Sequence, residues 1–112
     1  MGLINHLRDT EPFSSLPEET LQEINSSVTE KTFTAGTWVC RENQAPTGHL
    51  YIIKSGIVEI SVLTPGGVDM IVDYRSDGAF FGGTPVFTGD NYSASVRTAN
   101  DTICYLIPEE VL

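Results

Sequence analysis

The sequence predicts an α+β domain: an eight-stranded antiparallel β-roll (a jelly roll, or double-stranded β-helix) with short N-terminal helices and the start of a C-terminal helix. Two observations predict it. Apolar residues recur at helical spacing only before residue 28, and beyond it they alternate with period two in short runs separated by turn residues. The 112 residues fit one domain. We therefore expect a helical segment over 1–27, the β-roll over 28–107 and a truncated helix over 108–112.

The helical segment is predicted to contain two helices. Three apolar residues at helical spacing within 3–7 predict a single turn. Ser15 and Glu18 have the spacing of a capping box, and Pro17 between them suits the first turn of a helix. We therefore predict that the second helix starts near Ser15.

The β-roll is predicted from seven runs with strand periodicity and a short eighth strand that ends at Phe81 in a glycine turn. Alternation in the fourth run places Val58, Ile60 and Val62 inside the roll and Ser61 outside. The seven runs are Val28–Phe33, Trp38–Arg41, His49–Lys54, Ile57–Leu63, Val68–Tyr74, Tyr92–Thr98 and Ile103–Leu106.

The last residues predict the beginning of a helix. Pro108 has a φ angle suited to a first helical turn, and Glu109 and Glu110 favour the positive end of the helix dipole. Five residues are too few for that helix to cover anything. We therefore expect the chain to be a fragment of a longer protein.

Composition argues against several partners. The formal charge is −9, from 15 acidic and 6 basic residues, and the basic residues are scattered singly. An acidic field without a basic patch repels nucleic acid and anionic membrane surfaces. No apolar run approaches the roughly 20 residues that span a bilayer, and the N-terminus does not have the pattern of a secretory signal. We expect a cytoplasmic protein.

The chemistry of a catalytic site is not evident in the sequence. Cys40 and Cys104 each lie in a predicted strand and are expected to be buried free thiols, without a partner that would activate them. A metal site in a jelly roll needs two or three converging histidines, whereas the chain has only His6 and His49. We therefore expect no enzyme activity, no metal and no cofactor.

The most informative stretch is 78–98. A strand ending in Phe81-Gly82-Gly83 is followed by an uncharged run that predicts a short helix. Free backbone N–H groups at such a helix start favour anions. Residues 92–96 then predict a return strand whose small side chains leave room for a ligand.

This stretch resembles the phosphate-binding cassette of the cyclic-nucleotide-binding domain family. The family pattern is roughly Phe-Gly-Glu-Leu-Ala/Ser-Leu-Leu, a turn, then Pro-Arg-Ser/Ala-Ala-Thr-Val. Without a gap, Gly83 takes the place of the Glu, Asn91 that of the Pro and Tyr92 that of the Arg. The candidate ligand-binding residues that the resemblance implies are Phe81, Gly82, Gly83, Thr84, Pro85, Val86, Asn91, Tyr92, Ser93 and Ala94.

The resemblance extends over most of the chain. Residues 33–37 look like the family's aromatic-x-x-Gly turn, 50–60 like its glycine-centred hairpin, and 102–110 like its last strand and hinge. Residues 12–17, 80–82 and 101–108 look most like the sensor domain that precedes CBS domains and a nucleotidyltransferase in some bacterial signalling proteins. This implies a regulatory module that acts on catalytic domains of the same protein.

The replaced residues bear on the ligand. In the family the Glu holds the ribose 2′-hydroxyl and the Arg pairs with the cyclic phosphate, so Gly83 and Tyr92 imply that binding of cAMP or cGMP is weakened or lost. Tyr92 either fills the phosphate space or stacks on a base. Arg97 has the opposite strand parity and is expected to face solvent. The alternatives are a nucleotide bound in a modified way, another small anion or apolar ligand, and a cassette kept only for packing.

Two functions follow from these alternatives: a sensor that binds a nucleotide, and a protein-interaction domain that has lost its ligand. We expect Trp38 and Phe33 to be core residues and His49 to lie at a strand start. We also expect an exposed apolar face near Phe81, Val86 and Phe87, which would allow a weak homodimer.

Overall fold

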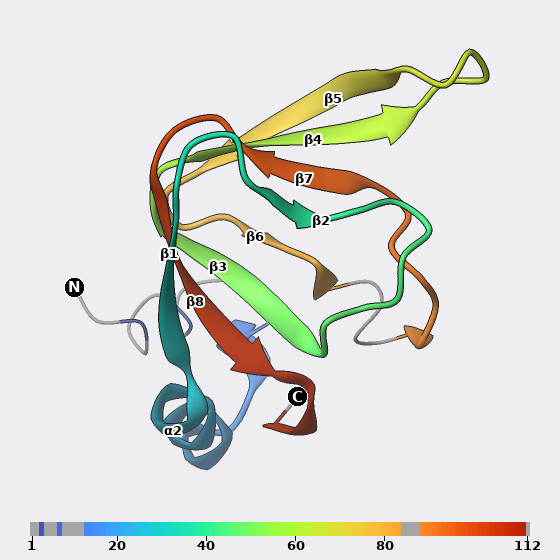
Figure 1. The fold of residues 1–112 in the computed structure, drawn as a ribbon. Helices are drawn as coiled ribbons and strands as arrows, with labels where there is room; N and C mark the ends of the chain where they lie inside the picture. The colour runs from blue at the N-terminus through green and yellow to red at the C-terminus, as the bar shows by residue number, and fades with distance from the viewer. Residues whose placement is uncertain (1–2, 4–6, 8–12, 84–87, 112) are drawn as a thin grey trace.

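In the computed structural model, residues 3, 7, 13–83 and 88–111 are described (Figure 1). They form two four-stranded sheets that curve around a shared core. The sheet orders are β1-β8-β3-β6 and β2-β7-β4-β5, and every pairing is antiparallel. The predicted number of strands is therefore confirmed. The strands are β1 (Thr29–Phe33), β2 (Trp38–Cys40), β3 (His49–Ser55), β4 (Ile57–Leu63), β5 (Asp69–Ser76), β6 (Phe80–Phe81), β7 (Ser95–Thr98) and β8 (Thr102–Pro108).

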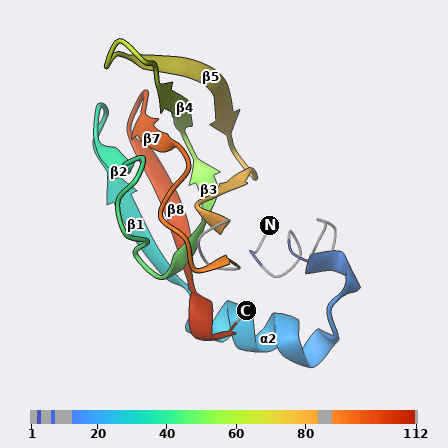
Figure 2. The same ribbon diagram turned by 90° about the vertical axis from the view of Figure 1, so that its right-hand side faces the viewer.

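Helix α2 (Glu18–Ser27) packs against the sheet that contains β3 and β8 (Figure 2). Its buried Leu21 and Ile24 contact a cluster that includes Leu50 and Ile107. The predicted start at Ser15 is wrong, because Pro17 is the N-cap. Its extended ψ of 149° keeps it outside the helix. Ser15 instead belongs to a separate 3-10 turn, η1 (Phe13–Ser15).

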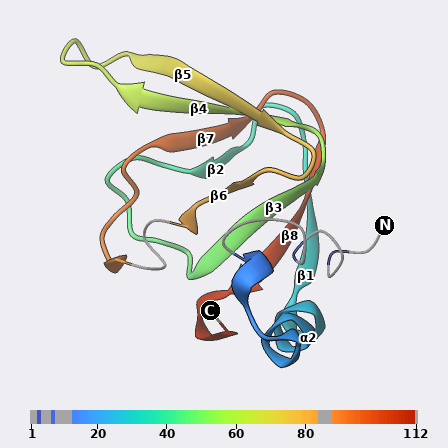
Figure 3. The ribbon, with the colours of Figure 1, turned by 180° about the vertical axis from the view of Figure 1, so that it is seen from behind.

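The C-terminal prediction is correct only in part, because a 3-10 turn forms there but Pro108 does not begin it. Pro108 is the last residue of β8, where it pairs with His49, and it does not start a helix. The backbone N–H of Glu109 donates to Gly48 O at 2.8 Å, which holds the chain against the start of β3. The following residues form the 3-10 turn η2 (Glu109–Val111), which lies beside α2 (Figure 3).

The core between the two sheets contains residues from both. Its members include Phe33, Tyr51, Phe81 and Tyr92, and Phe81 is only 3% exposed. The expectation that Phe81 is exposed is therefore wrong. Val86 and Phe87, the other two residues of that expected face, lie outside the described residues.

Strand β4 departs from simple alternation. Val58 and Ile60 are buried as predicted, but Ser61 is also buried and Val62 is only half-buried. The pairing of β4 with β5 also contains a bulge: Ile60 pairs with Asp73 and Ser61 pairs with Ile71, which leaves no β4 partner for Val72 of β5. An extra residue in one strand disrupts the regular pairing.

Strand β5 exposes several large apolar side chains. This strand is at the edge of its sheet and pairs only with β4, and together they form a long hairpin that extends beyond the neighbouring strands (Figure 1). Met70, Ile71, Val72 and Tyr74 are each about half exposed. Because successive residues of a strand point to opposite faces, apolar side chains are exposed on both faces of β5.

Trp38 was expected in the core, but it is exposed on the outer face of β2. Two arginines contact its ring, with Arg41 Cζ 4.0 Å and Arg97 Cζ 5.1 Å from the ring centroid. Arg97 Nε also donates to Gly36 O at 3.2 Å. Arg97 is thus exposed, as its strand parity predicted, and is held by backbone and aromatic contacts.

Candidate functional site

The candidate cassette connects β6 to β7. Its described residues are 81–83 and 88–94, whereas Thr84, Pro85 and Val86 lie outside the described residues. Gly82 has a φ of 75°, which glycine adopts without strain. A Cβ on Gly82 would lie 3.0 Å from Cδ2 of Tyr51, so the backbone passes directly over that ring.

Tyr51 connects the cassette to β3. Its ring stacks on Phe81 with the centroids 4.9 Å apart and the planes parallel within 1°. Its hydroxyl lies 2.8 Å from Thr47 Oγ1. Burial raises the pKa of Tyr51 to about 12, so the hydroxyl is neutral at physiological pH.

Tyr92 is the most informative residue of the cassette. Its side chain is 5% exposed and belongs to the core. Its hydroxyl accepts a hydrogen bond from the Thr47 backbone N–H at 3.1 Å and lies 3.2 Å from Thr47 Oγ1. Burial raises the pKa of Tyr92 as well. The ring thus fills core space, and the hydroxyl is satisfied by protein groups.

The backbone of Tyr92 is held by the loop between β2 and β3. Tyr92 N–H donates to Gln44 O at 3.1 Å, and its carbonyl accepts from Asn43 N–H at 2.8 Å. Asn91 adds a bond from its side-chain Nδ2 to Asn43 O at 2.9 Å. The predicted strand over 92–98 therefore starts only at Ser95, because Tyr92 pairs with this loop.

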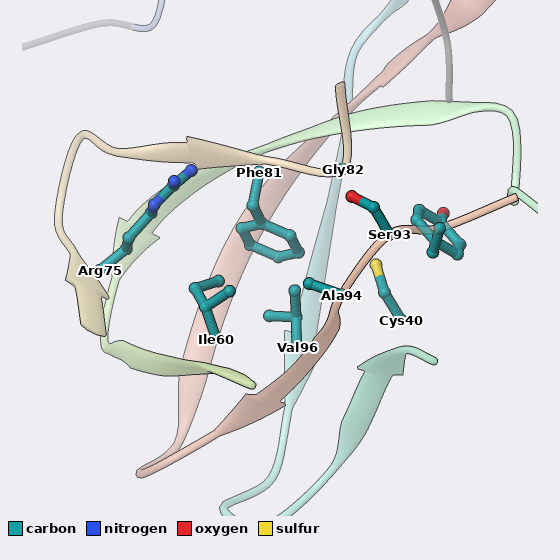
Figure 4. Close-up of a pocket in the computed structure, with 9 residues that line it drawn as sticks. Cys40, Ile60, Arg75, Phe81, Gly82, Ser93, Ala94 and Val96 are labelled. Atoms are coloured by element: carbon teal, nitrogen blue, oxygen red, sulfur yellow. The ribbon is translucent and has the colours of Figure 1, made fainter. Parts of the chain in front are cut away.

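A cavity of about 130 Å³ opens beside the cassette (Figure 4). Five of the ten candidate residues line it: Phe81, Gly82, Tyr92, Ser93 and Ala94. Gly83 and Asn91 do not belong to the lining. The other four lining residues, which the cassette pattern does not include, are Cys40, Ile60, Arg75 and Val96.

Arg75 is the one charged side chain among the described residues that line the cavity. Its Nη1 donates to Phe80 O at 2.6 Å, and its Nε lies 3.4 Å from Asp73 Oδ2. Arg75 lies opposite Val58 in the β4–β5 hairpin, so both side chains project from the inner face of the sheet. The sequence signal that could have identified Arg75 is the alternation of β4: Val58 faces inward, and the residue that pairs with it across the hairpin faces the same way.

Both cysteines of the core are neutral. Burial raises the pKa of Cys40 to about 11 and that of Cys104 to about 11, so both remain thiols at physiological pH. His49 is at the start of β3, as predicted, and its Nδ1 lies 3.1 Å from Thr47 O. His6 lies outside the described residues. Within 13–83 and 88–111, no three His, Cys, Asp or Glu side chains gather in a way that could hold a metal ion.

Comparison with known proteins assigns the chain to a family. Residues 30–112 match the cyclic nucleotide-binding domain, and the chain belongs to that family. Comparison with curated proteins gives no match. No helix in the described part of the chain is long and apolar enough to cross a membrane.

Solved structures share the fold. The regulatory domain of Toxoplasma gondii PKA with cAMP superposes with a TM-score of 0.91 at 26% identity, covering 97% of this chain and 41% of that one. The sensor domain of the transcriptional regulator DNR from Pseudomonas aeruginosa has a TM-score of 0.82 at 24% identity, covering 96% and 71%. A regulatory subunit of a cAMP-independent protein kinase A from Trypanosoma cruzi, bound to guanosine, has a TM-score of 0.83 at 18% identity, covering 96% and 38%. This chain thus spans less than half of the two kinase regulatory chains.

Proposed function

We propose that this domain is a regulatory, non-catalytic module whose cassette binds cAMP or cGMP weakly or not at all. The observation that carries the proposal is the burial of Tyr92. At the position where the family pattern has a phosphate-binding arginine, this chain has a neutral phenol bonded to Thr47. A tyrosine hydroxyl so placed provides no charge for a phosphate.

The glycine at position 83 is also expected to weaken cyclic nucleotide binding. The residue has helical backbone but no side chain to reach a ribose hydroxyl. Hydrogen bonds to charged groups contribute about 1.5–3 kcal/mol each. Losing both the Glu and the Arg contacts would therefore weaken binding by about two to four powers of ten.

A second candidate function is a nucleotide sensor with a modified cassette. The observation in its favour is the cavity itself, which remains open and has Arg75 in its wall. The 26% identical Toxoplasma gondii domain was solved with cAMP, which makes cAMP the first ligand to test. Under this alternative, Tyr92 would leave its bond to Thr47 when the nucleotide enters.

The module is proposed to act within a larger bacterial signalling protein in the cytoplasm. Residues 12–17, 80–82 and 101–108 support a sensor that precedes CBS and nucleotidyltransferase domains. A weak homodimer is proposed through β5, because its half-exposed apolar residues form the surface that a second copy could bury by two-fold symmetry.

Thermal melting with and without nucleotide tests the proposal. We expect a dissociation constant above roughly 100 μM, so that 1 mM cAMP or cGMP stabilises the domain by less than about 1.4 kcal/mol. The corresponding shift in Tm is below about 8 °C for a domain of this size. A larger shift with either nucleotide would favour the sensor.

A further inference from the structure

The cavity beside the cassette has the size of a single ring. An engineered protein cavity of about 150 Å³ binds benzene, whereas pockets for drug-sized ligands measure about 300–1,000 Å³. At about 130 Å³, this cavity falls near the first value. Four of its lining side chains, Ile60, Phe81, Ala94 and Val96, are apolar. The occupant that these walls favour is one apolar ring.

Arg75 adds a fixed cation to one end of the cavity. Figure 4 shows its side chain extending from β5 toward β6, beside Ile60 and Phe81. The contacts with Phe80 O and Asp73 orient the guanidinium and engage two of its five N–H donors. The planar guanidinium fork matches a carboxylate, which it can bind through two parallel bonds.

The opposite end of the cavity is polar but uncharged. Figure 4 shows Ser93 and Cys40 on the side away from Arg75, with the Ser93 hydroxyl near Gly82. Cys40 is a neutral thiol at physiological pH, as described above. The cavity therefore presents a cation at one end, apolar walls between, and hydrogen-bonding groups at the other end.

We propose that this cavity binds a small aromatic monocarboxylate, with the carboxylate on Arg75 and the ring between Ile60, Phe81 and Val96. The inference rests on the proposed function, because a tightly bound cyclic nucleotide would compete for the same cavity. A second polar substituent opposite the carboxylate would reach Ser93. Asp73 and the net charge of −9 oppose the anion, so the affinity is expected to be in the millimolar range at moderate salt.

The test is an NMR titration of the domain with benzoate and 4-hydroxybenzoate at moderate salt. We expect saturable amide shifts at Phe81, Gly82 and Ala94, with 4-hydroxybenzoate binding at least as tightly as benzoate. Benzamide, which has the same ring without the charge, should bind about tenfold more weakly, the loss expected from one charge-assisted bond. Inorganic phosphate should not displace benzoate.

Matched variants test whether benzoate binds in this cavity through Arg75. Arg75→Gln should weaken benzoate binding about tenfold, whereas Arg97→Gln, on the outer face of the same sheet, should leave it unchanged. If Arg75→Gln does not fold, Ala94→Leu tests the same cavity by filling it and should abolish the shifts. The absence of localised shifts up to about 20 mM benzoate, or equal binding by Arg75→Gln, overturns the inference.

Parallel titrations with cAMP separate this inference from the proposed function. Weak cAMP binding without benzoate binding overturns only the carboxylate site. Tight cAMP binding overturns the proposed function, and benzoate that then competes with cAMP would leave the Arg75 contact in place. Tight cAMP binding without benzoate binding overturns both.

Discussion

Restoring the two replaced cassette residues should restore cyclic nucleotide binding. The variant is Gly83→Glu with Tyr92→Arg. Gly83 has helical backbone, so a side chain fits its conformation. Each substitution would add a hydrogen bond to a charged group, worth about 1.5–3 kcal/mol. Together they should tighten cAMP binding by about two to four powers of ten, measured by calorimetry.

The same variant should be less stable without ligand. Tyr92 is 5% exposed, and its removal takes an aromatic ring from the core together with the bond to Thr47. Losing such a ring costs about 3–5 kcal/mol, and the arginine that replaces it has no anion to pair with in the empty cassette. We therefore expect the variant to melt at a lower temperature and to recover stability as cAMP is added.

Tyr92→Phe is the matched control for this experiment. It keeps the ring in the core but removes the hydroxyl, so it should lower stability by about 1 kcal/mol or more and bring no gain in cAMP affinity. A folded double variant that binds cAMP no better than the native chain would refute the reasoning. It would mean that the backbone of the cassette no longer has the form that binds a phosphate.

Three further predictions concern stability and association. Gly82→Ala should destabilise the domain in urea unfolding more than Gly89→Ala does. Both glycines have φ near 75°, but only a Cβ on Gly82 would meet Tyr51, so equal losses of stability would contradict the close approach of Gly82 to that ring. The thiols of Cys40 and Cys104 have pKa values raised from 9.0 to about 11. Between pH 9 and 11 only the unfolded state loses these protons, so the free energy of unfolding should fall in that range and be constant below pH 9. The loss is at most about 3 kcal/mol per thiol. Alanine at both positions should flatten the pH profile below about pH 10, above which the raised pKa values of Tyr51 and Tyr92 still lower stability. Val72→Lys on β5 should abolish self-association in sedimentation at millimolar protein, and unchanged association would place the dimer contact elsewhere.

Much of the fold was predictable because its signals are local. Alternating apolar residues and turn glycines located most of the strands within one or two residues. The helix start was misplaced because Pro17 fits both the first turn and the cap, and only its ψ decides between them. Pro108 was misassigned for a related reason: its pairing with His49 is a contact over 59 residues, which a local pattern cannot contain.

The candidate site was predictable only in part. The ungapped cassette pattern located Phe81, Gly82 and Tyr92, which lie together beside the cavity. It did not locate Arg75, because this residue reaches the cavity through the register of a hairpin and not through proximity in the chain.

Trp38 is a residue for which the sequence pattern predicted burial and the structure shows exposure. Its hydrophobicity predicted burial, but Trp38 is exposed, and the guanidinium groups of Arg41 and Arg97 both contact its ring. A hydrophobic residue in a strand gives no indication of which face of the sheet it occupies. The ring contacts with the two arginines became visible only in three dimensions.

We propose that Tyr92, bonded to Thr47, occupies the place of the phosphate-binding cation. The most direct test is a crystal structure of the domain grown in about 10 mM cAMP. We predict that Tyr92 remains buried, that its hydroxyl stays bonded to Thr47, and that no cyclic phosphate lies on the backbone of Gly82. A nucleotide bound there, with Tyr92 displaced from Thr47, would contradict the account.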